Sequence, residues 1–125
     1  MGLGQIKFRT EAYFYQKLAG YGLTPVLLEV GDNYLKIERY EVSLEDALIS
    51  RSITNAKYRE IYNKIVSLVR QLDQYGIIHN DLSPRNIVCE INFNNLAIID
   101  FESAVGVDSL VSNMDAHFEQ FSVEI

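Results

Sequence analysis

The segment from His79 to Asn86 reads His-Asn-Asp-Leu-Ser-Pro-Arg-Asn and constrains the fold more than any other part of the sequence. It follows a long helical pattern and precedes two short apolar runs, the second of which ends at Asp100. Pro84 has no backbone N–H and keeps the residue before it out of helical geometry, so this segment is predicted to be a loop. If the two apolar runs pair as a hairpin, Asp100 returns to the start of the first run, beside Asn86.

Asp81, Asn86 and Asp100 provide two carboxylates and one amide oxygen. Hard oxygen atoms of this kind are the ligands that Mg²⁺ prefers, and proteins commonly bind Mg²⁺ through one or two carboxylates together with phosphates. A further carboxylate, held apart from the metal, can accept the proton of an attacking hydroxyl. An isolated Asp-Leu-Ser-Pro stretch is more typical of a turn. The linked Asn86 and Asp100 instead favour a site for phosphoryl transfer, which depends mainly on positioning and charge neutralisation.

The pattern along the chain predicts an α+β fold in a single domain, residues 1–125. Helices are indicated by apolar residues at i, i+3 and i+4, and hairpins by alternating apolar residues around turn residues. The expected elements are a helix from about Thr10 to Gly20, a hairpin of 26–30 and 34–40, a short helix capped by Ser43, a long helix from Thr54 or Asn55 to near Gly76, a hairpin of 87–91 and 96–99, and a helix over 108–121. This order differs from the regular strand–helix alternation of a parallel sheet.

The composition excludes several classes of protein. The net charge is −6 and the basic residues are scattered, which argues against nucleic acid as a partner. No apolar run approaches the length of about 18 residues that spans a membrane, and the N-terminus does not resemble a secretory signal. The one cysteine, Cys89, cannot form an internal disulfide and is expected to be a buried core thiol. These features predict a cytoplasmic protein.

The sequence resembles the protein-kinase-like superfamily. His79, Asp81 and Asn86 match its catalytic-loop pattern H-x-D-x-x-x-x-N. Asp100 and Phe101 match the Asp-Phe pair that follows a strand in the same family. The spacing, and the place of the second motif after a strand, make the match more specific than three residues alone.

The resemblance extends over nearly the whole chain, from Glu11 to Asp115. Glu11 looks like the ion-pairing glutamate of the family's αC helix, and Asp115 looks like the aspartate that ties down the catalytic loop. Residues 37–40 look like the hinge that holds adenine, and residues 43–46 look like the start of the next short helix.

The resemblance implies a reduced protein-kinase-like fold, in which residues 1–40 form a partial N-lobe (αC helix, hairpin and hinge) and residues 41–125 form a shortened, mainly helical C-lobe. It implies that Asp81 is the catalytic base, that Asn86 and Asp100 bind Mg²⁺, and that ATP is the phosphate donor. The residues expected near the nucleotide are Lys7, Glu11, Ile37, Glu38, Tyr40 and Ser83.

The sequence also departs from the family pattern. Only ten residues precede Glu11, too few for the family's glycine-rich loop and lysine strand. Lys7 lies four residues before Glu11, a spacing that also forms ordinary ion pairs on a helix surface. Glu102 replaces the glycine of the D-F-G motif, and Ser83 stands where protein kinases often have lysine.

These departures leave three functions open. Ser83 resembles RIO-type protein kinases and favours ATP-dependent phosphorylation of serine or threonine on a protein substrate. The H-N-D and D-F-E sequences resemble choline kinases and aminoglycoside phosphotransferases, and they favour a small-molecule hydroxyl acceptor. Without a glycine-rich loop, the chain could instead be a pseudokinase that acts as a binding module, with a homodimer or another chain covering an exposed N-lobe edge.

Overall fold

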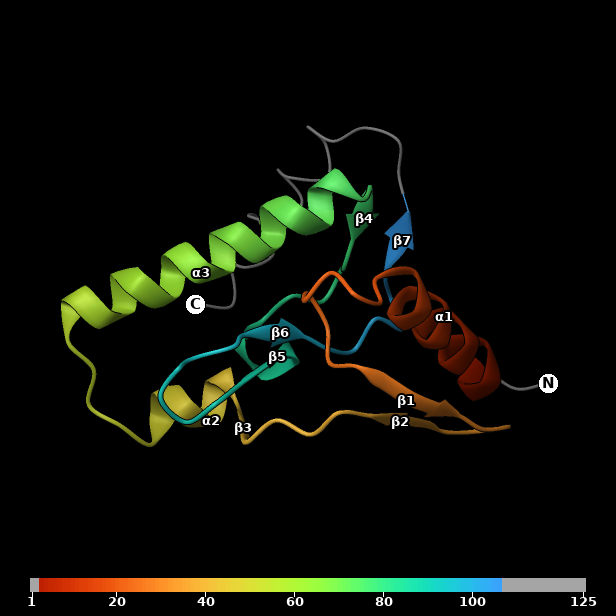
Figure 1. Ribbon diagram of the computed structural model, residues 1–125, viewed down its shortest axis with the longest axis horizontal. Helices are drawn as coiled ribbons and strands as arrows, with labels where there is room; N and C mark the ends of the chain where they lie inside the picture. The colour runs from red at the N-terminus through yellow and green to blue at the C-terminus, as the bar shows by residue number, and fades with distance from the viewer. Residues whose placement is uncertain (1–2, 107–125) are drawn as a thin grey trace.

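The computed structural model describes the chain from Leu3 to Gly106, with side chains described from Arg9 onward (Figure 1). The helix predicted over 108–121, and Asp115 within it, lie outside the described residues. The described part combines helices with small antiparallel sheets, which is the predicted α+β class. No helix in this part of the chain is both long and apolar enough to cross a lipid bilayer.

The described helices are α1 (Leu3–Lys17), α2 (Leu44–Ile49) and α3 (Asn55–Gln74), together with a short 3₁₀ turn, η1 (Pro84–Asn86). Helix α1 begins at Leu3, so the expected start near Thr10 was wrong. That expectation followed the apolar residues that face the core, whereas the preceding residues lack such a pattern. They include good helix formers such as Gln5 and Lys7, which extend the helix beyond its apolar stripe.

Local capping explains why α2 and α3 begin where the sequence predicted. The Ser43 hydroxyl accepts a hydrogen bond of 3.1 Å from the Asp46 N–H at the start of α2. The Thr54 hydroxyl accepts a matching bond of 3.1 Å from the Lys57 N–H at the start of α3. Each hydroxyl satisfies an N–H group that has no partner within its own helix. After α3 the chain reverses at Gly76, whose φ of +68° favours glycine.

Both predicted hairpins are present, with shorter strands than expected. Strands β1 (Leu27–Val30) and β2 (Leu35–Ile37) pair antiparallel. Strands β5 (Ile87–Cys89) and β6 (Ala97–Ile98) also pair antiparallel, which returns the chain from the end of β6 to the start of β5.

Three further strands of two residues each were not predicted. Strand β3 (Val42–Ser43) pairs with β5, which gives a sheet of order β3-β5-β6. Strands β4 (Ile77–Ile78) and β7 (Val105–Gly106) pair with each other and flank the loop region on both sides. Segments of two residues carry no periodicity, so only their distant pairing partners define them as strands.

A continuous apolar core joins α1, α3 and the strands. Figure 1 shows α3 along one side of the β3-β5-β6 sheet, with α1 and the β1–β2 hairpin together at the other end. The largest side chains that are almost fully buried are Phe93, Phe101, Leu18, Leu23, Leu44, Leu72, Ile77, Leu82, Ile87 and Ile98. Cys89 is also buried, as predicted. Because Ile77 and Ile87 are both fully buried, the core holds the 79–86 loop from each end.

Candidate active site

His79 is the buried anchor of the 79–86 loop. Its Nε2 lies 2.7 Å from the Ile99 carbonyl oxygen, and its Nδ1 lies 3.1 Å from the Asp81 backbone nitrogen. The carbonyl can only accept and the backbone N–H can only donate, so Nε2 carries the proton and Nδ1 accepts. Burial lowers the pKa of His79, which keeps the ring neutral. This geometry agrees with the structural role that the resemblance implies for His79.

Asn86 is joined to Asp81 by its side-chain amide. Its Nδ2 donates to the Asp81 carbonyl oxygen at 2.8 Å and to Asp81 Oδ2 at 3.2 Å. The η1 turn holds Asn86 in this position, with a bond of 2.9 Å from its N–H to the Ser83 carbonyl oxygen. Since the amide nitrogen is directed at Asp81, Oδ1 is the Asn86 atom that can act as a metal ligand.

The Asp81 carboxylate is partly exposed and lies beside a guanidinium group. Arg85 Nη2 is 3.1 Å from Asp81 Oδ1, and the two side chains are 52% and 40% exposed respectively. An ion pair this exposed contributes little to stability. The exposure matters more for chemistry, because a general base must be reachable by the hydroxyl whose proton it accepts.

Asp100 is carried to the same place by the β5–β6 hairpin. The N–H of Ile99 donates to the Asn86 carbonyl oxygen at 2.9 Å, which sets the segment bearing Asp100 beside Asn86. The Asp100 backbone has a φ of +63°, a left-handed conformation that is uncommon for residues other than glycine. The structure therefore brings together the three residues predicted to be catalytic.

Phe101 connects this site to helix α1. It is fully buried, and its ring centroid lies 4.9 Å from that of His79, 5.6 Å from that of Tyr15 and 6.0 Å from that of Phe14. Aromatic contacts at these distances add to the stabilisation from burial alone. The residue after Asp100 is thus fixed both to the loop and to the helix.

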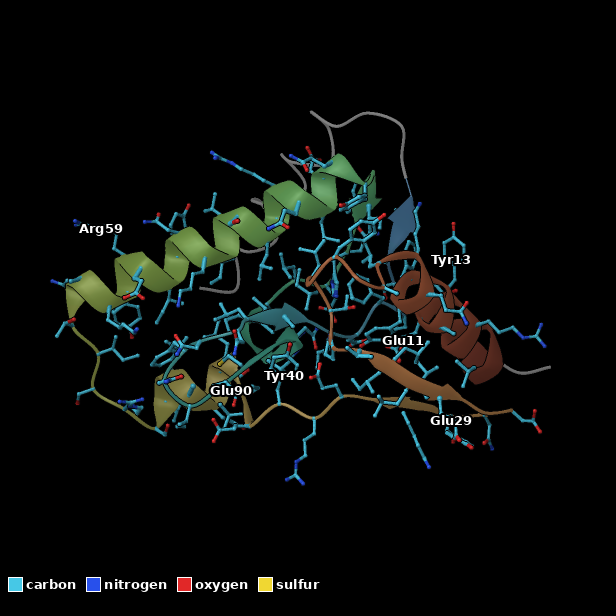
Figure 2. All side chains as sticks on the ribbon, in the orientation of Figure 1. Glu11, Tyr13, Glu29, Tyr40, Arg59 and Glu90 are labelled. Atoms are coloured by element: carbon cyan, nitrogen blue, oxygen red, sulfur yellow. The ribbon has the colours of Figure 1, made fainter. Side chains whose placement is uncertain are left out.

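Glu11 points from α1 toward this site, whereas Tyr13 points away from it (Figure 2). The Glu11 carboxylate accepts a hydrogen bond from the Phe101 backbone N–H. Burial, together with the negative charges of Asp100 and Glu102, raises the pKa of Glu11. Lys7 lies one turn earlier on α1, and its side chain is not among those described.

The predicted hinge residues form a second group. Glu38 and Tyr40 line a cavity of about 440 Å³ between the end of α1 and β1, and Tyr15 forms part of its wall. The Glu38 N–H and carboxylate are both bonded to the backbone of Val26, at 2.8 and 3.3 Å. Ile37 lies at the end of β2, paired with Leu27, and does not line this cavity.

Ser83 lies inside the loop rather than on its surface. The residue is 1% exposed, and its hydroxyl oxygen has no hydrogen-bond partner within the described part of the chain. Burying a hydroxyl without a hydrogen-bond partner costs free energy, a cost that a serine on a surface turn does not have. Ser83 does not belong to the residues that line the hinge cavity.

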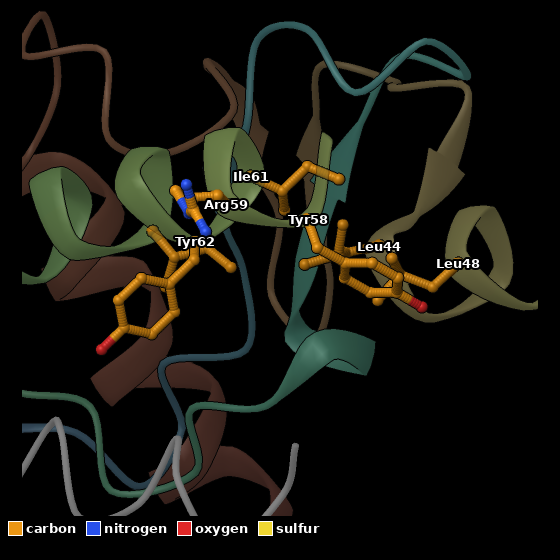
Figure 3. Close-up of a pocket in the computed structure, with 7 residues that line it drawn as sticks. Leu44, Leu48, Tyr58, Arg59, Ile61 and Tyr62 are labelled. Carbon is orange, nitrogen blue, oxygen red and sulfur yellow. The ribbon is translucent and has the colours of Figure 1, made fainter. Parts of the chain in front are cut away.

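A third feature is an apolar groove of about 360 Å³ between α2 and α3 (Figure 3). It is lined by Leu44, Leu48, Tyr58, Arg59, Ile61, Tyr62 and Ile65. None of the residues predicted to bind ATP or Mg²⁺ belongs to this lining. Its lining has one charged side chain and no carboxylate, so it lacks the converging polar groups of a nucleotide site.

The donor set fits Mg²⁺ when the metal is bound together with a nucleotide. No group of three or more His, Cys, Asp or Glu residues suited to a metal ion occurs among residues 3–106. The Asn86 amide oxygen and the Asp100 carboxylate are instead two oxygen donors carried by segments that the bond from Ile99 to Asn86 joins. Mg²⁺ commonly takes only one or two carboxylates from the protein and completes its shell with phosphates and water.

Tyr15 is the residue whose role the sequence did not indicate. Its apolar periodicity marks it as a core or rim residue, yet in the structure it contacts Phe101 and also lines the hinge cavity. The one available signal was its position four residues after Glu11, on the same face of a helix. The contact of Arg85 with Asp81 was not predicted either.

Comparison with known proteins supports the resemblance to the protein-kinase-like superfamily. Residues 27–115 match the family model described as RIO domain. The probable serine/threonine-protein kinase irlC of Dictyostelium discoideum is 40% identical over 62 residues, which make up 50% of this chain and 4% of that protein. The match therefore spans only a small part of the length of that relative. Because the family match covers more than half of the chain and includes the whole 79–101 region, this chain belongs to the RIO domain family and has a reduced protein-kinase-like fold.

Proposed function

We propose that this chain is a kinase-like phosphotransferase that moves the γ-phosphoryl group of ATP to a hydroxyl group, with serine or threonine of a protein as the acceptor. The observation that carries the proposal is the bonded arrangement of Asp81, Asn86 and the Asp100 segment. Two side-chain bonds join Asn86 to Asp81, and one backbone bond joins Asn86 to Ile99. On this proposal the base and the two metal ligands lie on segments that hydrogen bonds hold next to one another.

In the proposed reaction the acceptor oxygen attacks the γ-phosphorus, and the bond from that phosphorus to the β–γ bridging oxygen breaks. The proton of the acceptor hydroxyl passes to the exposed carboxylate of Asp81. Asn86 Oδ1 and the Asp100 carboxylate would hold Mg²⁺. When bound, Mg²⁺ supplies neutralisation of the charge on the phosphate oxygens.

The nucleotide base is proposed to occupy the hinge cavity lined by Glu38 and Tyr40. Its volume of about 440 Å³ lies within the ordinary range of small-molecule sites. Tyr15 lines this cavity and contacts Phe101, so one side chain joins the cavity lining to the residue that follows the proposed metal ligand Asp100. Glu11 and Lys7 are proposed to act near the phosphates, with Lys7 supplying the positive charge. Ile37 would support the hinge from the end of β2, and Ser83 would help to place the transferred phosphate.

The choice of a protein acceptor rests on two observations. The relative with 40% identity is named a probable serine/threonine-protein kinase, and Ser83 resembles the RIO-type loop. A small-molecule hydroxyl is the alternative acceptor, favoured by Glu102 after Asp100 and Phe101. The two are separated by the acceptor that becomes labelled.

A binding module without turnover is a second candidate function, and the β1–β2 hairpin favours it. Within residues 3–106 this sheet has two strands, and Val26, Leu28 and Val30 are 58%, 66% and 43% exposed. Open strand edges with apolar side chains are suited to pairing with another chain. A homodimer or a partner chain would then cover this edge.

The deciding experiment incubates the protein with Mg²⁺, γ-labelled ATP, a serine- and threonine-containing peptide library and a panel of small alcohols. We expect label on peptides, and loss of more than about 100-fold in rate with Asp81→Asn. The matched control is Asp32→Asn, because Asp32 is an exposed aspartate in the β1–β2 turn. Absence of transfer and of ATP hydrolysis, with Asp81→Asn indistinguishable from the unchanged protein, would exclude the enzyme. Sedimentation of the protein alone would then test whether two copies of the chain associate, as a homodimeric binding module requires.

A further inference from the structure

Tyr15 stands between the hinge cavity and the metal-ligand segment. It is only 2% exposed, and its ring meets the Phe101 ring edge-on at 5.6 Å. The same side chain lines the cavity that also contains Glu38 and Tyr40. One buried residue of α1 therefore contacts both parts of the candidate site.

The backbone at Asp100 needs support from its surroundings. Its φ of +63° is a conformation that residues other than glycine rarely hold unless neighbouring groups fix it. The backbone here is held through two consecutive N–H groups, each of which donates to a side chain of α1. The N–H of Asp100 donates to the Tyr15 hydroxyl, and the N–H of Phe101 donates to the Glu11 carboxylate. Glu11 and Tyr15 are four residues apart and lie on one face of α1, so this face holds both N–H groups.

We propose that Tyr15 is a positioning residue, whose hydroxyl holds the Asp100 backbone in its left-handed conformation and thereby fixes where the Asp100 carboxylate points. This proposal rests on the proposed function, because it assigns the carboxylate to Mg²⁺. Phenylalanine at position 15 would keep the ring and its contact with Phe101, and would remove only the hydroxyl. The hydroxyl, and not the ring, supplies the acceptor for the Asp100 N–H, so phenylalanine at position 15 removes this hydrogen bond.

The environment of Tyr15 suits this role. Burial, with the negative charges of Glu11 and Asp100, raises the pKa of Tyr15 far above its ordinary value. A neutral hydroxyl can accept the Asp100 N–H without adding a further negative charge beside Glu11 and Asp100.

The test is Tyr15→Phe, with Tyr13→Phe as the matched control. Tyr13 lies on the same helix, is 55% exposed and points away from the site. Both variants keep the aromatic ring, and their thermal midpoints show that they fold. The first measurement is amide hydrogen exchange at Asp100 by NMR, without nucleotide. We expect exchange at Asp100 to accelerate about fivefold or more in Tyr15→Phe and to be unchanged in Tyr13→Phe.

The second measurement is phosphate transfer as a function of Mg²⁺ at saturating ATP. We expect the Mg²⁺ concentration for half-maximal rate to rise about tenfold in Tyr15→Phe, with little change in KM for ATP at saturating Mg²⁺. Unchanged exchange at Asp100, or an Mg²⁺ dependence equal to that of Tyr13→Phe, would overturn the proposal. If the unchanged protein transfers no phosphate, the proposed function fails, and the exchange measurement still decides whether the hydroxyl holds the Asp100 backbone.

Discussion

The side-chain amide of Asn86 donates to both the main chain and the side chain of Asp81, at 2.8 Å to the carbonyl oxygen and 3.2 Å to Oδ2. These two bonds determine how each residue can act. They direct the amide nitrogen of Asn86 inward, so its oxygen is the atom left for a metal. They also fix one carboxylate oxygen of Asp81, which limits the rotation of the proposed base.

Asn86→Asp tests this arrangement, because aspartate is a better Mg²⁺ ligand but cannot donate. A carboxylate oxygen would then face two Asp81 oxygens at distances where the amide nitrogen now lies. We expect unfolding free energy to fall by about 1–3 kcal/mol and phosphate transfer to be lost. Urea unfolding and the transfer assay measure both effects. Asn63→Asp, on an exposed position of α3, is the matched control and should change neither. Full activity in Asn86→Asp would contradict the assigned orientation.

His79 predicts a pH dependence of stability. Burial lowers its pKa in the folded state below the ordinary value of 6.5. The unfolded chain therefore binds a proton at His79 more readily than the folded chain does. The stabilisation from the neutral ring is complete above pH 6.5 and is lost as the pH falls from there through the folded pKa.

The measurement is urea unfolding at pH 7.5 and 5.5. We expect the decrease between these two pH values to be smaller in His79→Gln than in the unchanged protein, because glutamine does not titrate. His117→Gln, at a position outside the described residues, is the comparison that removes the other histidine. An equal decrease in His79→Gln and the unchanged protein would contradict the assignment.

The sequence predicted those elements whose signals are local. Ser43 and Thr54 were recognised as the start of α2 and α3 because their hydroxyls cap the helix that immediately follows. The return of Asp100 to Asn86 followed from recognising a hairpin, and the bond from Ile99 to Asn86 confirms that placement. By contrast, the pairing of β4 with β7 joins segments almost 30 residues apart and left no pattern in either one.

The chemical details of the site were less predictable for the same reason. The apolar periodicity of α1 is compatible with an inward-facing Tyr15, but it cannot say which distant N–H the Tyr15 hydroxyl accepts. The ion pair of Asp81 with Arg85 depends on the turn at Pro84–Asn86, whose 3₁₀ geometry the sequence did not specify. Side-chain contacts that depend on the backbone geometry of a turn, or on a distant segment, can be identified only from the structure.

Cys89 predicts slow thiol chemistry in the native protein. Its side chain is fully buried in β5, and burial together with nearby Glu90 and Glu41 raises its pKa to about 11. Modification at pH 8 thus requires opening of the fold. We expect a thiol reagent to react with Cys89 at least about 1,000-fold more slowly than with the new thiol of Ser52→Cys, an exposed position. Comparable rates would show that β5 opens locally.

Phe101 and Phe93 allow stability to be separated from site assembly. Both are almost completely buried, so replacing either with alanine should cost about 3–5 kcal/mol of unfolding free energy. Phe93 contacts Arg51 and Lys57 near the start of α3, whereas Phe101 joins Asp100 to His79 and Tyr15.

The gentler variants Phe101→Leu and Phe93→Leu, each expected to cost about 1–2 kcal/mol, make the comparison in folded protein. Phosphate transfer and the thermal shift caused by ATP with Mg²⁺ are measured at a temperature where both variants are folded. We expect both signals to weaken in Phe101→Leu and to persist in Phe93→Leu, because only Phe101 fixes the backbone beside the proposed metal ligand. Equal losses in the two variants would mean that general destabilisation, and not the position of Asp100, explains the effect.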